Sequence, residues 1–178
     1  MVMAGLLCGG QYASAQSSGL ELHANDKAGA SEIGLPSYPR ATPYKDKDDD
    51  SSTFNLGYTF GDSSFKLMGA NYITSDSASQ VLSFYRKPLS RYGEVLECKD
   101  GKPVGSMTVT KSGLSCADNQ GGHVQINGHN DANGEELRAG TPHEFRIVGI
   151  DKPVAKGTRF ALVYVQLPKD SDSAKKSK

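Results

Sequence analysis

Two stretches late in the chain constrain its fold more than any other feature. Residues 145–150 and 159–167 are the most strand-like segments, and both carry apolar side chains at odd and at even positions. Apolar residues on both parities predict strands that are covered on both faces and therefore lie inside a sheet. The connection between them, residues 151–157, suits an antiparallel pair. The chain is thus expected to build its core around central antiparallel strands.

A hairpin is predicted earlier in the chain. Apolar residues alternate with smaller or polar ones over residues 54–60, which is the period-two pattern of a half-buried strand. Gly61-Asp62-Ser63 supplies turn chemistry, and residues 65–74 read as the return strand. That second strand has apolar residues on both parities, so it too is expected inside the sheet.

One helix is predicted after this hairpin. Ser77 and Gln80 have the spacing of a capping box, and Gly93 stands where a left-handed C-cap is expected. A core-facing stripe runs between them: Val81, Leu82, Tyr85, Leu89 and Tyr92. Pro88 interrupts this pattern because it cannot donate to the Phe84 carbonyl. We expect either a kink over residues 84–88 or two short helices.

The remaining segments are shorter. Residues 94–98 read as a third strand, 113–116 as a short fourth segment and 123–126 as a candidate fifth, whereas residues 99–111 read as a variable excursion and 127–136 as a loop or tight hairpin. The fold class predicted is α+β, a two-layer sandwich in which an antiparallel sheet of about five strands carries one helix on one face.

The chain of 178 residues is long enough for one domain. We assign that domain to residues 36–167, preceded by a mostly disordered arm, residues 16–35, and followed by a disordered polar tail, residues 168–178. Residues 1–15 read as a truncated signal peptide, because a short apolar run precedes Ala13-Ser14-Ala15, a signal-peptidase pattern. A lipid-modified Cys8 and an ordinary flexible terminus are the alternatives.

The other two cysteines fit an exported chain. Cys98 follows a strand-like segment and Cys116 follows Leu114-Ser115, with a Gly- and Lys-rich excursion between them. An even cysteine pair in an exported protein is normally oxidised, so a Cys98–Cys116 disulfide is predicted, two separate thiols in the core being the alternative. Localisation is expected to be periplasmic or secreted.

A set of structural residues resembles a pattern in small exported bacterial proteins of unknown function. The residues that carry it are Tyr38-Pro39, Ser75-Asp76-Ser77, Val81, Phe84-Tyr85-Arg86, Leu89, Tyr92-Gly93, Leu137-Arg138-Ala139-Gly140-Thr141, Gly157-Thr158-Arg159-Phe160 and Leu162-Val163-Tyr164. The likeness spans residues 36–167, and Pro88 departs from the alanine-like residue of the pattern. The resemblance implies the fold and export, and it assigns no catalytic residue.

Charge and motif content narrow the function classes. The 20 basic and 20 acidic residues balance, so no net charge attracts the chain to nucleic acid or to an acidic membrane surface. No apolar run reaches the length of a transmembrane helix. Common nucleophile, P-loop, dinucleotide and zinc-protease motifs are absent. No catalytic residue and no cofactor is therefore assigned.

Two residue groups remain as candidate sites. His123, His129 and Asp131 offer nitrogen and oxygen ligands from one short segment, although turn chemistry alone also explains its Asn, Asp and Gly content. The tyrosines Tyr38, Tyr44 and Tyr58 form a candidate aromatic binding surface, with half-buried packing as the alternative.

We therefore expect a non-enzymatic exported binding or envelope-associated module with an envelope or extracellular partner. The alternative is a secreted hydrolase or a metal-binding protein that uses His123, His129 and Asp131.

Overall fold

The computed structural model describes residues 29–45, 51–60, 63–116, 134–151 and 157–168. The predicted signal peptide, most of the predicted arm and residues 169–178 of the tail lie outside these residues. The elements, in chain order, are α1 (Ala30–Ile33), β1 (Thr42–Pro43), β2 (Thr53–Phe60), β3 (Ser63–Thr74), α2 (Ala78–Leu89), a 3-10 turn (Ser90–Tyr92), β4 (Leu96–Lys99), β5 (Lys102–Pro103), β6 (Glu135–Thr141), β7 (Glu144–Ile150) and β8 (Thr158–Gln166).

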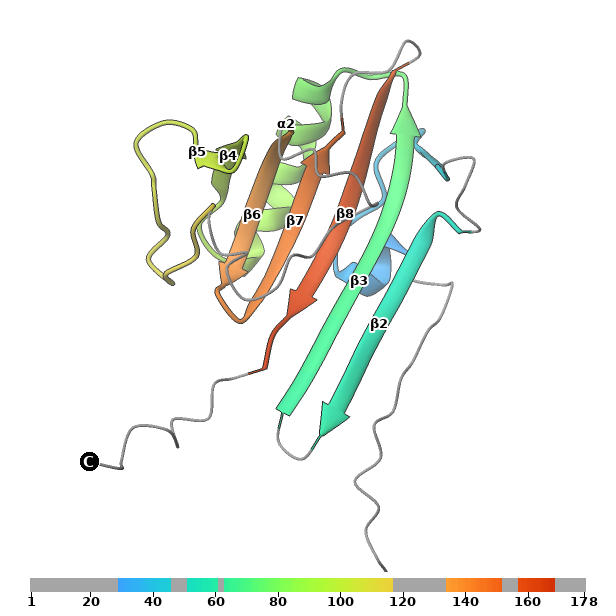
Figure 1. Ribbon diagram of the computed structural model, residues 1–178. Helices are drawn as coiled ribbons and strands as arrows, with labels where there is room; N and C mark the ends of the chain where they lie inside the picture. Colours follow the sequence, from blue (N-terminus) through green and yellow to red (C-terminus); the bar gives the residue numbers. More distant parts are fainter. Residues whose placement is uncertain (1–28, 46–50, 61–62, 117–133, 152–156, 169–178) are drawn as a thin grey trace, which may run out of the picture.

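The strands form one antiparallel sheet with the order β1-β3-β8-β7-β6-β4-β5, and β2 pairs with β3 (Figure 1). Strands β1 and β2 lie end to end on the same side of β3, since β1 pairs with residues 72–73 of β3 and β2 with residues 63–70. The predicted hairpin is confirmed, and β3, β7 and β8 are interior strands as predicted.

The predicted class of an antiparallel α+β sandwich holds, but the sheet has eight strands rather than about five. The largest difference is β6, where the sequence indicates no strand beyond the loop ending at Glu136. On the face of the sheet away from α2, β6 carries a charged pair in place of apolar residues. Arg138 is 3% exposed, and its guanidinium lies 2.6 Å from the Glu136 carboxylate. Because charged residues occupy positions where a buried strand usually has apolar ones, the hydrophobic pattern of the sequence does not reveal β6. Residues 113–116, predicted as a short fourth segment, do not form a strand; within them, Ser115 makes an isolated β-bridge with Val109.

Helix α2 begins where the capping box predicts. The Ser77 hydroxyl accepts a hydrogen bond from the backbone N–H of Gln80 at 3.4 Å. The Gln80 side-chain oxygen accepts one from the backbone N–H of Ser77 at 2.9 Å. The helix passes through Pro88 and ends one residue later, at Leu89, where the 3-10 turn begins. Because the proline stands in the last turn, the chain loses regular helical bonding only where the helix is already ending.

The main core lies between α2 and the sheet. Val81, Leu82, Tyr85 and Leu89 are the buried residues of the helix, and they pack over β6 and β7. Their partners on the sheet include Leu137, Val148 and Leu162.

Helix α1 covers the part of this face that α2 does not reach. It lies against β3 and β8, and Ile33 is fully buried. These residues belong to the segment predicted as a mostly disordered arm, so the structure differs from that prediction from Ala30 onward. Ala30, Ile33 and Leu35 pack into the core here, and the run is too short to show a helical period in the sequence.

Candidate functional site

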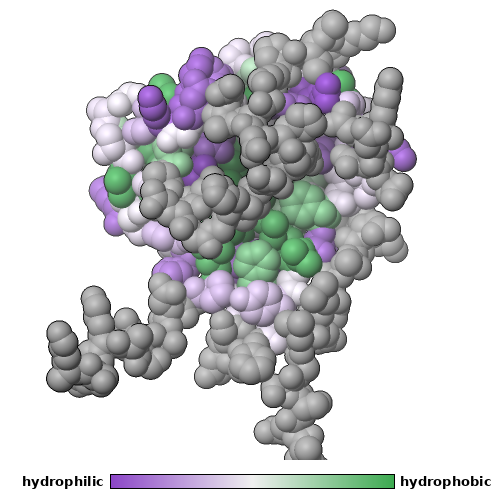
Figure 2. Space-filling view, viewed as in Figure 1, coloured by the Kyte–Doolittle hydropathy of each residue, from purple (hydrophilic) through white to green (hydrophobic). Residues whose placement is uncertain are grey.

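The sheet face opposite the helices carries a second set of apolar side chains. Successive strand residues point to opposite faces, so β8 sends Leu162 toward α2 and Val163 away from it. The buried members of the second set are Leu114, Phe145, Ile147, Val163 and Val165. Figure 2 views this face, on which apolar side chains gather over the strands.

The β2–β3 hairpin extends this apolar surface to the edge of the sheet. Its members, which we call the hairpin patch, are Phe54, Leu56, Tyr58, Phe65 and Leu67. The strand register places Leu56 opposite Leu67 and Tyr58 opposite Phe65. Four of the five side chains are half-buried, while Leu56 is 42% exposed and is one of the most exposed large apolar residues described.

Aromatic contacts organise the hairpin patch. The rings of Tyr58 and Phe65 stack with centroids 5.6 Å apart and an interplanar angle of 22°. The Phe54 ring lies directly over Gly69, where an added Cβ would overlap it. A glycine in the middle of a long strand thus provides the space into which the edge-strand aromatic packs. Both β2 rings of the patch, Phe54 and Tyr58, are therefore packed against residues of β3.

A cation–aromatic pair marks the other end of the same face. The Arg159 guanidinium lies 4.5 Å from the Tyr44 ring centroid, and it is 3.8 Å from the Asp151 carboxylate. Tyr44 donates its amide to the Asn71 carbonyl at 2.9 Å, which fixes it beside β3. The face therefore has a polar, charged end at Arg159 and an apolar end at the hairpin.

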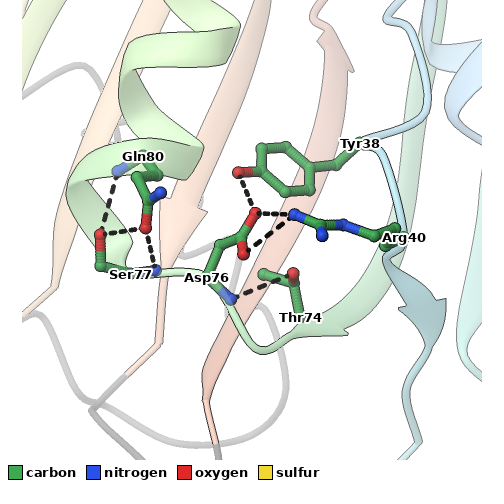
Figure 3. Close-up of polar contacts among 6 residues, drawn as sticks. All are labelled: Tyr38, Arg40, Thr74, Asp76, Ser77 and Gln80. Carbon is green, nitrogen blue, oxygen red and sulfur yellow. Dashed lines mark hydrogen bonds and ion pairs between the residues drawn. The ribbon is translucent and has the colours of Figure 1, made fainter.

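A polar cluster ties the segment before β1 to the start of α2 (Figure 3). The Tyr38 hydroxyl donates to an Asp76 carboxylate oxygen at 2.9 Å, and Arg40 approaches both oxygens at 3.4 Å. The Asp76 amide in turn donates to the Thr74 hydroxyl at 3.3 Å. Burial, helped by the hydrogen bond to Asp76, raises the pKa of Tyr38. The carboxylate is already satisfied by two donors, so this cluster is a structural clamp.

A second clamp is built around Arg146 on the helix-covered face. Its guanidinium lies 3.7 Å from the Tyr92 ring centroid and 4.8 Å from that of Tyr164. Its Nε donates to the Ile33 carbonyl at 3.1 Å, so the cation joins helix α1 to the sheet. The flanking rings and the carbonyl account for its position without a ligand.

The predicted disulfide is present, with the Cys98 and Cys116 Cα atoms 5.8 Å apart and both residues buried. His123, His129 and Asp131 lie outside the described residues. Within the part of the chain that the structure describes, no group of three or more His, Cys, Asp or Glu residues is placed to hold a metal ion.

The structure separates the three predicted surface tyrosines. Tyr38 lies in the main core, 8% exposed and packed edge-on against Phe84 and Phe160. Tyr44 and Tyr58 lie on the opposite face, half-buried, at its two ends. Only Tyr58 belongs to the hairpin patch.

From the sequence, the other residues of the hairpin patch could be recognised only as parts of strands. The alternation over residues 54–60 predicts a strand with one apolar face, and apolar alternation is normally read as a face turned to the core. The signal for a surface is the rarer combination of that alternation with an edge position. An edge position is not visible in the strand's own sequence.

No protein-family model, no curated protein and no solved structure matches this chain. The resemblance to small exported bacterial proteins accordingly stays a prediction.

Proposed function

We propose that this protein is an exported, non-enzymatic binding module whose hairpin patch recognises aromatic or aliphatic side chains of a protein partner. The observation that carries this proposal is the exposed end of the apolar face. Leu56, 42% exposed, stands among the aromatic rings of Phe54, Tyr58 and Phe65 on the face that the helices leave open. Apolar surface gathered in this way is typical of an interaction site.

The rigidity of the hairpin patch supports recognition of a partner. Aromatic side chains provide large contact areas with few rotatable bonds, so little conformational entropy is lost when they bind. Here Tyr58 is already stacked on Phe65, and Phe54 is seated on Gly69. The surface therefore needs little reorganisation to accept a side chain.

The disulfide supports the location that the proposal requires. Disulfides persist in oxidising compartments, and the Cys98–Cys116 bridge is compatible with an extracytoplasmic protein. Separately, none of the described helices has the length and apolar character needed to cross a bilayer.

Selection from a random peptide display library tests the proposed function without a known partner. Peptides enriched on the wild-type protein should share aromatic or aliphatic residues. They should bind the Leu56→Lys variant at least about tenfold more weakly, because the charge would be desolvated in the patch.

Thr59→Lys is the matched control. Thr59 is exposed on the same strand, and its parity places it on the other face from Leu56. Selected peptides should bind this variant as well as they bind the wild type. Absence of enrichment, or equal loss of binding in both variants, would refute recognition by the hairpin patch.

A further inference from the structure

Strand β2 is an edge strand without the usual protection. Its sequence from Thr53 to Phe60 contains no charged residue and no proline. Edge strands of natural proteins are normally short, charged, bulged or covered, because an open edge pairs readily with another strand. The register of β2 on β3 is continuous over its whole length, so no bulge twists this edge away.

The other edge segments of the sheet do carry protection. Strand β5, at the opposite end, is two residues long and consists of Lys102 and Pro103. Strand β1, beside β2 on the outer side of β3, is also two residues long and contains Pro43. Among the described edge segments, β2 alone is both long and unprotected.

Backbone direction shows which groups β2 presents to a new strand. An antiparallel strand directs its N–H and C=O groups alternately to the two sides. The Ser52 carbonyl accepts a hydrogen bond from the Asn71 backbone amide at 2.8 Å. Every second residue from Ser52 onward, including Leu56, therefore directs its backbone N–H and C=O groups toward β3. Asn55, Gly57 and Thr59 therefore direct their backbone groups to the outer edge. Of the described strands, only β3 pairs with β2.

We propose that β2 pairs antiparallel with β2 of a second copy of this chain, so that the two sheets join edge to edge across a two-fold axis at Leu56. In this register the outward groups of Asn55 meet those of Gly57 of the second copy. Leu56 faces Leu56, Phe54 faces Tyr58 and Thr53 faces Thr59. Aliphatic, aromatic and threonine pairs are the favourable classes of cross-strand neighbours, and no like charges oppose each other along the strand.

Self-complementarity favours a second copy over a foreign strand. An isologous two-fold interface requires that each residue suit the residue at the symmetric position. Strand β2 meets this condition on both faces of the sheet. Its apolar residues lie opposite apolar residues of the second copy on one face, and its small or polar residues lie opposite small or polar residues on the other face. The proposal concerns the backbone edge, and it stands independently of the binding function proposed for the patch.

The first test is the mass of the full chain in solution. Sedimentation equilibrium should give twice the chain mass of 19.0 kDa for the wild type, in a concentration-dependent manner. Asn55→Pro should be monomeric, because it removes an outward N–H and adds a ring at the edge while leaving the bonds to β3 in place. Asn55→Thr, the matched control, keeps the N–H and should remain dimeric. A monomeric wild type at the highest accessible concentration, or a dimeric Asn55→Pro variant, would overturn the proposal.

Cysteine cross-linking tests the register and does not depend on the folding of the proline variant. In a Cys8→Ser background, Leu56→Cys places two thiols across the axis at a non-hydrogen-bonded pair, about 4.5 Å between Cα atoms, which a disulfide can bridge. Mild oxidation should yield a covalent dimer. Thr59→Cys is exposed on the same strand, but its symmetric copy would be six residues away, about 20 Å. Equal cross-linking of the two variants would show random collision and refute the register.

Discussion

Reducing the Cys98–Cys116 disulfide should lower the free energy of unfolding by about 3 kcal/mol. The two cysteines are 18 residues apart, and closing a loop of that length removes about this much entropy from the unfolded chain in the loop-closure model. Both sulfurs are buried in a small cluster with Leu96 and Met107. Reduction removes no side-chain heavy atom from this cluster, so the comparison of oxidised and reduced wild type tests the cross-link without creating a cavity.

Urea unfolding followed by circular dichroism measures this effect, which suits a chain without tryptophan. With a slope of about 2 kcal/mol per molar urea, the midpoint should fall by about 1.5 M on reduction. The Cys98→Ala/Cys116→Ala double variant should be at least as destabilised and should not respond to the reductant. Cys8→Ser should behave as the wild type.

A change of less than about 1 kcal/mol on reduction would refute the reasoning. That result would mean that the unfolded chain gains little freedom, because it is already compact around this loop. A response of the double variant to the reductant would show that the effect does not come from this bridge.

Three further predictions concern the core and the hairpin. Gly69→Ala should destabilise the protein by about 1–3 kcal/mol in urea unfolding, because the new methyl group displaces the Phe54 ring from β3; an unchanged midpoint would contradict this packing. Tyr38→Phe should lose about 1–2 kcal/mol, because the Asp76 carboxylate loses its shortest hydrogen bond while the ring stays in the core; a neutral substitution would mean that Arg40 alone holds Asp76. Burial raises the pKa of Tyr85, so the folded protein keeps a proton that the unfolded chain releases near pH 10, and stability should fall above that pH. Tyr85→Phe, which also loses the hydrogen bond to the Pro36 carbonyl, should show a weaker alkaline decline, and an unchanged slope would assign the effect to other groups.

The sequence predicted those parts of the fold that local patterns determine. The capping box at Ser77 placed the start of α2, and apolar residues on both parities placed β3, β7 and β8 inside the sheet. In these segments the buried apolar residues recur with the period of the helix or strand that they stabilise. The sequence of the single element is therefore enough to predict it.

Long-range pairing determined the parts that were not predicted. Strand β6 buries Arg138 against Glu136, and the guanidinium also donates to the Ser115 carbonyl at 3.3 Å. Whether such a charged residue is exposed or buried depends on a partner segment that its own sequence does not specify. The two-residue strands β1 and β5 have no period at all, so pairing with β3 and β4 is what defines them.

The candidate site shows the same limit in a different form. Alternation over residues 54–60 correctly indicated a strand with one apolar face, but it could not indicate that the strand lies at the edge or that its apolar face points away from the helices. Both properties follow from the strand order and from the side on which α2 packs. A binding surface made of ordinary core-type residues is therefore recognised only after the sheet has been assembled.

The proposed dimer and the proposed binding function share one consequence that can be measured. Pairing through β2 would place the two hairpin patches on the same face of a continuous sheet, with the two copies of Leu56 at their junction. A peptide that contacts both patches must favour the dimer, and by linkage the dimer must bind that peptide more tightly by the same factor. Asn55→Pro should then weaken peptide binding although every patch side chain is retained. If the peptide contacts a single hairpin, its affinity should be the same for Asn55→Pro and for the wild type, and dimerisation and recognition would be independent properties of the same strand.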